Sequence, residues 1–565
     1  MSWARPIPTV GDQTSAAHRA ADPTGWSLGA QTIEALREVI GARRDIRRFR
    51  PDPVAPQLLR SVLAAGHLAP SVGHSQPWRF IVVSEQRTRD RAALLADRER
   101  LRQADLLEPD RRARLLDLQL EGLREAPVGI VVACDRRTAA AGVLGRATFT
   151  DTDLWSCACA IENIWLAARA AGLGLGWVTL FQPADLAELL NLPDGVQTLG
   201  WLCLGWPDER PPEPGLQRNA WSERLPLDEV IIAERWPAEG APVPPPSHLA
   251  APAPHAVVGA RDSGDDLLSA PGSLGILDAA INRVLALGGP ELAGGTLVLV
   301  AADHPVTSHR ISAYPASVTA EVLAATEAGQ SVGATAARHA GLAVRSLRAL
   351  PSGPAGDLVT ADALTAADVE SLIAQGKSLG RLAAREGLVC LGEVAVGNTT
   401  VAAALSCALL GLEVEQAIGL GVGSDAGILA RKRSVVAAAV QRARKLHGAA
   451  LADPLTALAA VGGPEFAVLT GLTLAAAEAR VPVILDGLAT SLAALIAVRL
   501  EPAAQSVLVA GQRSRERAHR AVLTELGLEP LLDLRLRAGE GVGACLAAQL
   551  LLTGLRVRRD AGRVR

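Results

Sequence analysis

The sequence predicts a chain of two domains, a mixed α+β domain followed by an α/β domain built on a parallel sheet. Two features predict the division. All ten tryptophans lie between Trp3 and Trp236, whereas the rest of the chain contains only Tyr314 and Phe466 as Phe, Tyr or Trp residues. Seven prolines then fall between residues 237 and 255. The length of 565 residues would by itself allow about three or four domains, but two large domains account for it.

The proline-rich segment marks the boundary between the two domains. Proline donates no backbone hydrogen bond, so 237–255 is expected to be an extended, semi-rigid linker, and the polar run Arg261–Asp266 is expected to continue it. The sequence therefore predicts a loose arm at 1–26, the first domain at 27–236, the linker at 237–266, the second domain at 267–556 and a basic tail at 557–565.

Helices and strands are mixed in the first domain. A helical pattern runs from Gln31 to Ile40, and an amphipathic helix is expected at Asp153–Ala171. Apolar runs rich in β-branched residues predict strands at Phe80–Val83, Val128–Ala133 and Leu199–Leu204.

In the second domain, short β-branched runs alternate with long Ala/Leu-rich helices. This alternation is typical of parallel strands joined by crossover helices. Strands are expected at Thr296–Ala301, Leu388–Val396, Val481–Leu485 and Ser506–Val509, and helices at Val401–Leu412 and Ala544–Leu552.

Charge and composition exclude several classes of partner. The formal charge is −3 and the sequence pI is about 6.4, so no basic face is expected for nucleic acid or an anionic membrane. The longest apolar runs are too short to cross a bilayer, and the first residues show no apolar signal core. Seven cysteines are dispersed without a CxxC pair. We therefore expect buried reduced thiols, no zinc or other metal, and a cytoplasmic location.

The first domain contains a candidate site for a flat, phosphorylated ligand. Arg43, Arg44 and Arg47 follow the first helix, and guanidinium groups bind phosphate bidentately. A solvated charge run at a helix end has the same composition. Small residues in APSVGHSQPW (69–78), including Ser71, leave room beside a ring system. The glycines of GLGLGWVT (172–179), including Gly176, permit close backbone approach to a ligand, although they do not follow the dinucleotide fingerprint.

The second domain contains a candidate phosphate cradle and a candidate base. A strand leads into Gly397, Asn398, Thr399 and Thr400 at a helix start, where free N–H groups favour phosphate. Ordinary helix capping would explain the same residues. Glu540 lies between two glycines before a buried helix. Partial desolvation there would favour a general base, although a simple loop has the same pattern.

The first domain resembles the 5,6-dimethylbenzimidazole synthase (BluB) family, which has a nitroreductase-like flavin fold. The motifs RRDIRRF, APSVGHSQPW, NIWLAARAAGLGLGWV and WLCLG carry the resemblance across residues 31–236. The family consumes reduced FMN (FMNH2) and O2 and releases dimethylbenzimidazole. The resemblance implies that Arg43, Arg44 and Arg47 hold the flavin and that Asp45 is the acid/base group. The resemblance also implies a catalytic hydroxyl at Thr179, which stands where the family has a serine.

Two other interpretations stay open for this domain. Asp45 could be a salt-bridge partner that steadies the neighbouring arginines. The domain could also be an ordinary flavin or nitro reductase that retains FMN as a cofactor instead of destroying it.

The second domain resembles the nicotinate-nucleotide–dimethylbenzimidazole phosphoribosyltransferase (CobT) family, whose fold is a Rossmann-like α/β parallel sheet. The motifs include GEVAVGNTTVAAAL (392–405), VPVILDGLATSLAAL (481–495) and RAGEGVGA (537–544). The resemblance implies that Glu540 removes the benzimidazole N–H proton while residues 397–400 carry the 5′-phosphate. Glu393 and Lys432 match active-site positions, and Ser514 matches a serine near the nucleotide.

Some residues depart from the family pattern. Tyr314 and Val322 fall where the family lines its base pocket, so they are expected to affect which base is accepted. His304 is followed by Pro305 where His-Gly is usual, and residues 421–425 lack a common arginine. These departures leave the chemistry of Glu540 intact and concern the choice of substrate.

The product of the first family is the base substrate of the second. The sequence therefore predicts a bifunctional enzyme of cobalamin lower-ligand synthesis that makes α-ribazole 5′-phosphate from FMNH2, O2 and nicotinate mononucleotide. A separate flavin reductase is expected to supply FMNH2. Both families are typically homodimers with sites near the subunit interface, so a dimer or larger assembly is implied. A non-catalytic nucleotide-binding second domain stays open as an alternative.

Overall fold

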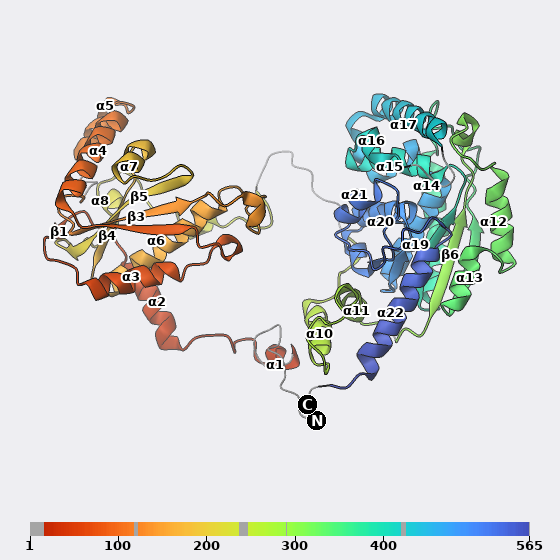
Figure 1. Ribbon diagram of the computed structural model, residues 1–565, viewed down its shortest axis with the longest axis horizontal. Helices are drawn as coiled ribbons and strands as arrows, with labels where there is room; N and C mark the ends of the chain where they lie inside the picture. The colour runs from red at the N-terminus through yellow and green to blue at the C-terminus, as the bar shows by residue number, and fades with distance from the viewer. Residues whose placement is uncertain (1–15, 118–121, 237–246, 290, 420–424, 564–565) are drawn as a thin grey trace. The chain divides into compact units, whose positions relative to one another are not determined.

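The computed structural model of the chain (Figure 1) describes residues 16–117, 122–236, 247–289, 291–419 and 425–563. The chain divides into two compact units. The N-terminal unit comprises Trp26–Pro242, and the C-terminal unit comprises Val243–Arg565 together with the first residues of the chain up to Gly25.

The N-terminal unit is built on a five-stranded antiparallel sheet with β5 near its centre. β3 and β4 both pair with β5, β2 pairs with β3, and the short β1 pairs with the end of β5. The glycine run of 172–179 forms β4, which the sequence did not predict as a strand. The strands are β1 (Phe49–Arg50), β2 (Trp78–Val83), β3 (Val128–Asp135), β4 (Gly174–Val178) and β5 (Val196–Pro207).

Helices cover both faces of this sheet, which explains why every residue of β3 up to Cys134 is buried. Residues of α6 pack with Ile130 and Leu202 on one face, and residues of α4 pack with Val131 and Trp201 on the other. The helices are α2 (Ala30–Ala42), α3 (Pro56–His67), α4 (Gln86–Ala104), α5 (Pro109–Asp117), α6 (Thr152–Ala170), α7 (Pro183–Leu189), α8 (Gly215–Arg218) and α9 (Leu227–Val230).

The C-terminal unit contains a five-stranded, all-parallel sheet in the order β10-β9-β8-β6-β7. The predicted strands are confirmed with small shifts at their ends, and β7 is an additional edge strand. The strands are β6 (Gly295–Ala301), β7 (Leu342–Arg348), β8 (Leu388–Val394), β9 (Val483–Leu485) and β10 (Leu508–Ala510).

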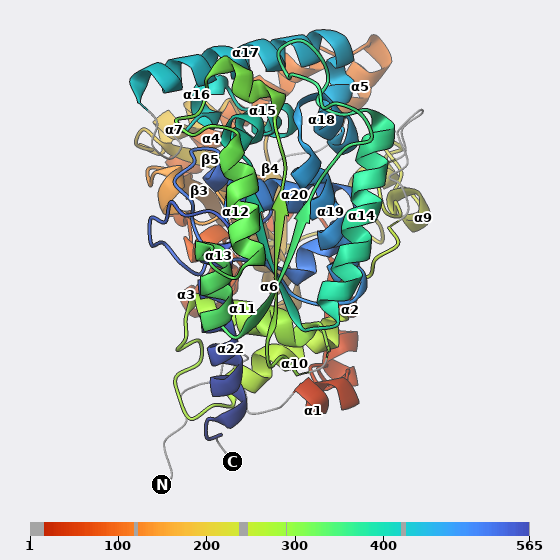
Figure 2. The same cartoon turned by 90° about the vertical axis from the view of Figure 1, so that its right-hand side faces the viewer.

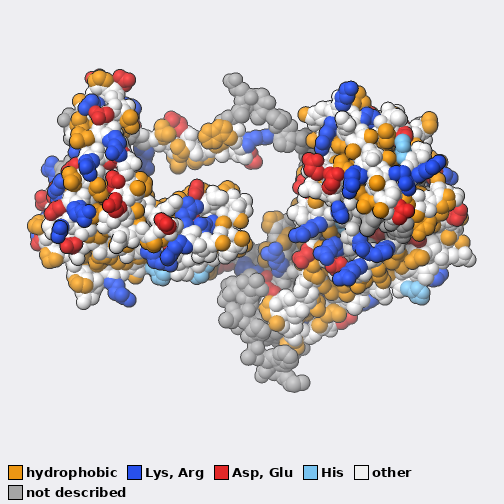
Figure 3. Space-filling model, turned by 45° about the horizontal axis from the view of Figure 1, so that its top comes forward, with side chains coloured by type: hydrophobic (Ala, Val, Ile, Leu, Met, Phe, Trp, Pro, Cys, Tyr) orange, Lys and Arg blue, Asp and Glu red, His pale blue; other side chains and the backbone are white. Residues whose placement is uncertain are grey.

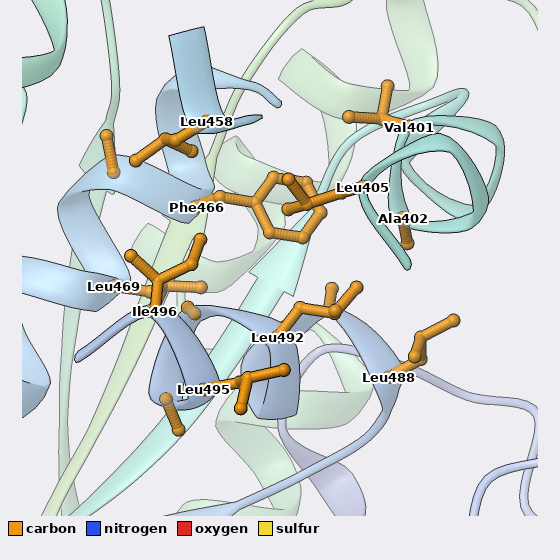
Figure 4. Packing of buried hydrophobic residues seen from close by; sticks show 14 of the residues in the cluster. Val401, Ala402, Leu405, Leu458, Phe466, Leu469, Leu488, Leu492, Leu495 and Ile496 are labelled. Carbon is orange, nitrogen blue, oxygen red and sulfur yellow. The ribbon is translucent and has the colours of Figure 1, made fainter. Parts of the chain in front are cut away.

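Alternate residues of these strands enter two separate cores. Val298, Val389 and Leu485 join the larger core, whereas Leu297 and Cys390 join the core on the opposite face. Figure 4 shows Phe466 of α19 at the centre of the larger core. Figure 2 shows α12 and α14 on the two sides of the green strands.

The helices of the C-terminal unit are of very different lengths. They are α1 (Ala16–Ala21), α10 (Pro254–Asp265), α11 (Ile276–Ala286), α12 (Ser317–Glu327), α13 (Val332–His339), α14 (Ala366–Ala384), α15 (Asn398–Leu410), α16 (Val414–Ala417), α17 (Ala426–His447), α18 (Pro454–Val461), α19 (Pro464–Glu478), α20 (Leu488–Leu500), α21 (His519–Glu525) and α22 (Val542–Asp560).

The structure corrects the predicted ends of the linker and of the two terminal segments. Most of Arg261–Asp266 lies in α10, which begins at Pro254 because the missing N–H of proline has no helical partner in the first turn. Arg558, expected in a basic tail, is buried in α22 and bonds Asp278 at 2.8 Å. In the predicted arm, Ala16–Ala21 form α1, and Arg19 bonds Asp262 at 2.7 Å. Linker residues 237–246 lie outside the described residues.

The surface agrees with the small net charge. Figure 3 shows acidic and basic side chains intermixed on the visible faces of both units. Among the helices of the described residues, none has the length and apolar character needed to cross a membrane.

Helices α14 and α19 approach closely because glycines face the opposite backbone. A Cβ at Gly376 of α14 would lie 2.0 Å from the carbonyl oxygen of Val468. A Cβ at Gly471 of α19 would lie 2.0 Å from the carbonyl oxygen of Ile373. Any side chain at either position would therefore push the two helices apart.

We expect Gly471→Ala to lower the free energy of unfolding of the C-terminal unit by about 2 kcal/mol, because the helices must separate to admit the methyl group. Thermal unfolding measures the loss. Gly259→Ala in α10 is the control, since a Cβ there meets nothing within 4 Å and alanine favours a helix over glycine. An equal loss in both variants would contradict the close-packing explanation.

Candidate active sites

In the N-terminal unit, the arginine loop after α2 runs along β4. The backbone of Asp45 forms an isolated parallel β-bridge with Leu175. The N–H of Ile46 donates to the carbonyl of Leu175 at 3.0 Å. A Cβ at Gly176 would lie 2.3 Å from the carbonyl oxygen of Ile46. Glycine is therefore required here for the approach of the loop to the strand, which gives part of the predicted glycine run a structural role.

Asp45 is held by a side chain and by the backbone. Its carboxylate accepts from the Arg47 guanidinium and from the N–H of Trp177 at 3.2 Å. Burial raises the pKa of Asp45, although Arg47 and the Trp177 N–H act in the opposite direction. A carboxyl group with a raised pKa exchanges protons more readily near neutral pH, as an acid/base group must.

The three predicted arginines share the loop but point to different partners. Arg43 lies over the ring of Trp165, 4.4 Å from its centroid. Arg44 donates to backbone carbonyls, including that of Pro212 at 2.7 Å. Arg47 contacts Asp45 and the Trp177 carbonyl, and its Nη1 is buried without a hydrogen-bond partner among the described residues. Arg47 therefore combines contact with Asp45 and a donor left for a ligand.

Within the described ranges, the two hydroxyl residues predicted here do not hydrogen-bond Asp45 or Arg47. The Ser71 hydroxyl accepts from the N–H of Gln76 at 3.0 Å within its own turn. Thr179 is exposed and directly follows β4. Glu209 also contributes to this site, although no sequence motif marks it. Its carboxylate, just beyond the end of β5, accepts from the N–H of Arg47 at 2.7 Å and so fixes the loop.

In the C-terminal unit, the candidate residues gather where the parallel strands end. His304 follows β6, Glu393 is near the end of β8, Asp486 follows β9 and Ser514 follows β10. Ligands of parallel α/β sheets bind at this carboxyl edge. The sheet order thus brings together residues that lie far apart in the sequence.

The predicted phosphate cradle has the geometry of an anion site at a helix start. Gly397 has φ 96° and caps α15, whose first residues are Asn398, Thr399 and Thr400. The Lys432 ammonium group donates to the Thr399 hydroxyl at 2.8 Å, and the buried Thr400 hydroxyl has no hydrogen-bond partner among the described residues. A cation beside hydroxyl groups at a helix start suits a phosphate, although the N–H groups of Asn398 and Thr400 already donate to the carbonyls of Ala395 and Gly397.

Glu540 is held against the sheet. It has φ 55°, a left-handed conformation that is strained for a residue with a side chain. Its carboxylate accepts from the N–H of Gly333 at 3.0 Å. A Cβ at Gly392 of β8 would lie 3.0 Å from the Glu540 carbonyl, so this glycine allows the loop to lie on the strand.

Asp486 anchors the segment that follows Glu540, a role that was not predicted from the sequence. Its carboxylate accepts from the backbone N–H of Gly543 at 2.8 Å and from the Gln512 amide at 3.1 Å. Burial raises the pKa of Asp486 to about 6, although these donors act in the opposite direction. The VILDG motif was the available sequence signal.

Glu393 lies among other acidic groups. Burial raises the pKa of Glu393 to about 8, with further increases from the charges of Glu465, Asp486 and Glu540, while a hydrogen bond from Asn398 lowers it. Glu465 is fully buried and lies 2.8 Å from the ring of His304. The edge of the sheet therefore concentrates carboxyl groups in a desolvated place.

The remaining predicted residues lie nearer solvent. Tyr314 is 49% exposed just before α12, where Val322 is half-buried. Ser514 is half-buried. Residues 421–424 of the departing segment lie outside the described residues. Within the described ranges, no group of three or more His, Cys, Asp or Glu side chains is arranged to hold a metal.

Comparisons with known proteins divide the chain in the same way. Residues 249–563 match the family described as Phosphoribosyltransferase, and residues 40–206 match the Nitroreductase family. Nicotinate-nucleotide–dimethylbenzimidazole phosphoribosyltransferase of Thermus thermophilus is 38% identical over 328 residues, which are 54% of this chain and 95% of that protein. 5,6-Dimethylbenzimidazole synthase of Rhodospirillum rubrum is 42% identical over 205 residues, which are 36% of this chain and 96% of that protein.

A solved structure supports the fold of the C-terminal unit. The crystal structure of CobT from Thermus thermophilus is similar with a TM-score of 0.51 and 37% identity, covering 55% of this chain and 97% of that one.

We expect the stability of the C-terminal unit to depend on the protonation of Glu393. With a folded-state pKa of about 8 against an ordinary value of 4.5, the folded chain retains a proton that the unfolded chain loses. The resulting stabilisation is present at low pH and is lost as the pH rises through about 8.

Glu393→Gln removes this dependence because the amide is neutral at every pH. The difference in melting temperature, parent minus variant, should therefore fall by several degrees between about pH 5 and pH 9. Glu370→Gln, at an exposed position of α14, is the control. A constant difference across this range would rule out the titration.

Proposed function

Because the N-terminal part of this chain belongs to the 5,6-dimethylbenzimidazole synthase family and the C-terminal part to the nicotinate-nucleotide–dimethylbenzimidazole phosphoribosyltransferase family, we propose that it is a bifunctional enzyme of cobalamin lower-ligand synthesis. The first unit converts FMNH2 and O2 to dimethylbenzimidazole. The second transfers phosphoribose from nicotinate mononucleotide to that base and releases nicotinate and α-ribazole 5′-phosphate.

The contact between Asp45 and Arg47 supports the first reaction. FMN fits this loop because Arg47 keeps a buried donor without a partner among the described residues and Gly176 brings the strand close. Reduced FMN supplies the redox chemistry and is consumed as substrate. Asp45 receives and returns protons as bonds of the flavin break, while the N–H of Trp177 orients its carboxylate. In this assignment Arg43 and Arg44 shape the loop, and Arg47 faces the flavin.

The second reaction is supported by Glu393, which accepts a hydrogen bond from Asn398 of the cradle and is near enough to Glu540 for the charge of Glu540 to raise its pKa. The start of α15 and Lys432 hold the 5′-phosphate. The Glu540 carboxylate takes the benzimidazole N–H proton as the other ring nitrogen attacks the ribose. The acidic groups near Glu393 favour the positive pyridinium of the substrate and the positive charge that develops on the ribose.

A common intermediate is the reason for joining the two units. Dimethylbenzimidazole made by the first unit is the acceptor of the second, and the linker keeps its local concentration high. FMNH2 comes from a separate flavin reductase. The substrates are small molecules of the cytoplasm, and Tyr314 and Val322 tune the choice of base.

Mass spectrometry of the full chain with FMNH2, air and nicotinate mononucleotide tests the function. We expect one flavin lost per α-ribazole 5′-phosphate. Asp45→Asn should lower dimethylbenzimidazole formation at least about 100-fold, and added dimethylbenzimidazole should restore formation of α-ribazole 5′-phosphate. Glu540→Gln should accumulate dimethylbenzimidazole instead, with the transfer slowed at least about 100-fold.

Each variant is the control for the other, because each retains one reaction. Intact FMN that merely cycles between oxidised and reduced forms would identify an ordinary reductase. Transfer at the parent rate in Glu540→Gln would remove the assignment of the base.

A second copy of the chain is the proposed partner of the N-terminal unit. Helix α2 has no buried residue in its own unit, and Ile33, Leu36 and Ile40 form an exposed apolar stripe at helical spacing. A 13-residue helix is marginal in water without packing. The similarity to the Rhodospirillum rubrum synthase extends over 205 residues, which is longer than the nitroreductase match at residues 40–206. It includes 96% of the Rhodospirillum rubrum protein. Elements flanking this match therefore exist in a protein without a transferase, where a second copy can cover them.

We expect the parent chain to be a dimer by light scattering and Leu36→Asp to shift it towards the monomer, because a charge is costly inside an apolar interface. Ala35→Asp, on the opposite side of α2, carries the same charge and should leave the mass unchanged. A monomeric parent, or equal effects of the two variants, would exclude this interface.

A further inference from the structure

A buried histidine that has no part in the proposed reaction contacts the turn after β10. His519, the first residue of α21, is 1% exposed. Its ring Nδ1 lies 2.9 Å from the backbone nitrogen of Ser514, and its Nε2 lies 3.0 Å from the hydroxyl of Ser491 on α20. The ring therefore joins a helix of the core to the turn after β10.

These contacts determine which ring nitrogen carries the proton. A backbone N–H can only donate, so Nδ1 accepts from Ser514 and must be unprotonated. The proton is then on Nε2, which donates to Ser491. Burial lowers the pKa of His519 to about 4, so the ring is neutral at physiological pH. A neutral, fixed ring can hold a neighbour in place but does not carry protons.

The residue it holds is at the carboxyl edge of the sheet. The Ser514 Cβ lies 3.5 Å from the position that a Cβ at Gly487 would occupy, and Gly487 follows Asp486 directly. The Ser514 hydroxyl accepts from the N–H of Glu516 at 3.4 Å, which leaves its own proton for a ligand. His519 thus fixes the backbone of a hydroxyl residue that lies beside Gly487, at the edge of the sheet where the proposed nucleotide site is.

We propose that His519 is a positioning residue for nucleotide binding, acting through the hydrogen bond from the Ser514 N–H to its Nδ1. The inference rests on the proposed phosphoribosyl transfer. Because Glu540, and not Ser514, removes the proton in the proposed reaction, loss of this hydrogen bond weakens nucleotide binding more than it slows the chemical step.

Two substitutions separate the two nitrogens. In His519→Asn the amide oxygen reaches the position of Nδ1 and keeps the bond from Ser514, whereas in His519→Gln the amide reaches Nε2 and keeps only the contact with Ser491. We expect His519→Gln to raise KM for nicotinate mononucleotide about tenfold, with kcat within about threefold of the parent. We expect His519→Asn to keep both constants within about threefold.

The two variants are matched, because each loses one buried hydrogen bond and each should lose similar stability. Equal KM values in the two variants would overturn the proposal, whether both are raised or neither is. Nitrogen-15 NMR of the parent chain with labelled histidine provides a second readout that needs no variant. A ring protonated on Nδ1 would also overturn it, and one protonated only on Nε2 supports it.

Calorimetry with nicotinate mononucleotide separates this inference from the proposed function. A parent that binds the nucleotide without transferring phosphoribose would refute the proposed function, and the inference would then be judged by the dissociation constants of the two variants. A parent that does not bind it would refute both.

Discussion

The hydrogen bonds of Asp486 determine where the C-terminal site can be. A buried carboxylate is costly unless donors surround it, and the first N–H groups of a helix lack partners unless an acceptor caps them. Asp486, at the end of β9, meets both needs by accepting from Gly543 and Ala544 at the start of α22. Glu540 lies immediately before that start, so its position follows from this contact. The Gln512 amide, from the end of β10, completes the arrangement.

The same edge gathers buried carboxyl groups at the expense of stability. Glu393 and Asp486 both have pKa values raised by burial, which means that their ionised forms are disfavoured in the folded chain. One carboxylate oxygen of the buried Glu465 has no hydrogen-bond partner in the described part of the chain. Such an environment lowers the stability of the folded chain by itself and favours the binding of a positively charged ligand, as the proposed function requires.

In the N-terminal unit, a loop instead of a helix start supplies donors to a buried carboxylate. Asp45 is held by the Trp177 N–H and by Arg47, and Gly176 allows the loop to reach the strand. In both units a glycine gives space for the backbone that carries the acidic residue, Gly176 in one and Gly392 in the other. The two units of this chain thus use the same arrangement in different folds.

The sequence alone was enough to predict the two fold classes, the division into two units and candidate residues for both sites. Proline density, strand alternation and local motifs such as GNTT and GEG depend on neighbouring residues, so one sequence suffices to detect them. Only the tertiary contacts show which of the clustered arginines pairs with Asp45, because Arg43 lies over Trp165 and Arg44 donates to backbone carbonyls, one of them that of the distant Pro212. The tertiary contacts also decided the roles of Asp486, Glu465 and His519. Their partners meet only when the order of the parallel sheet brings separate strand ends together, and no local pattern encodes that order.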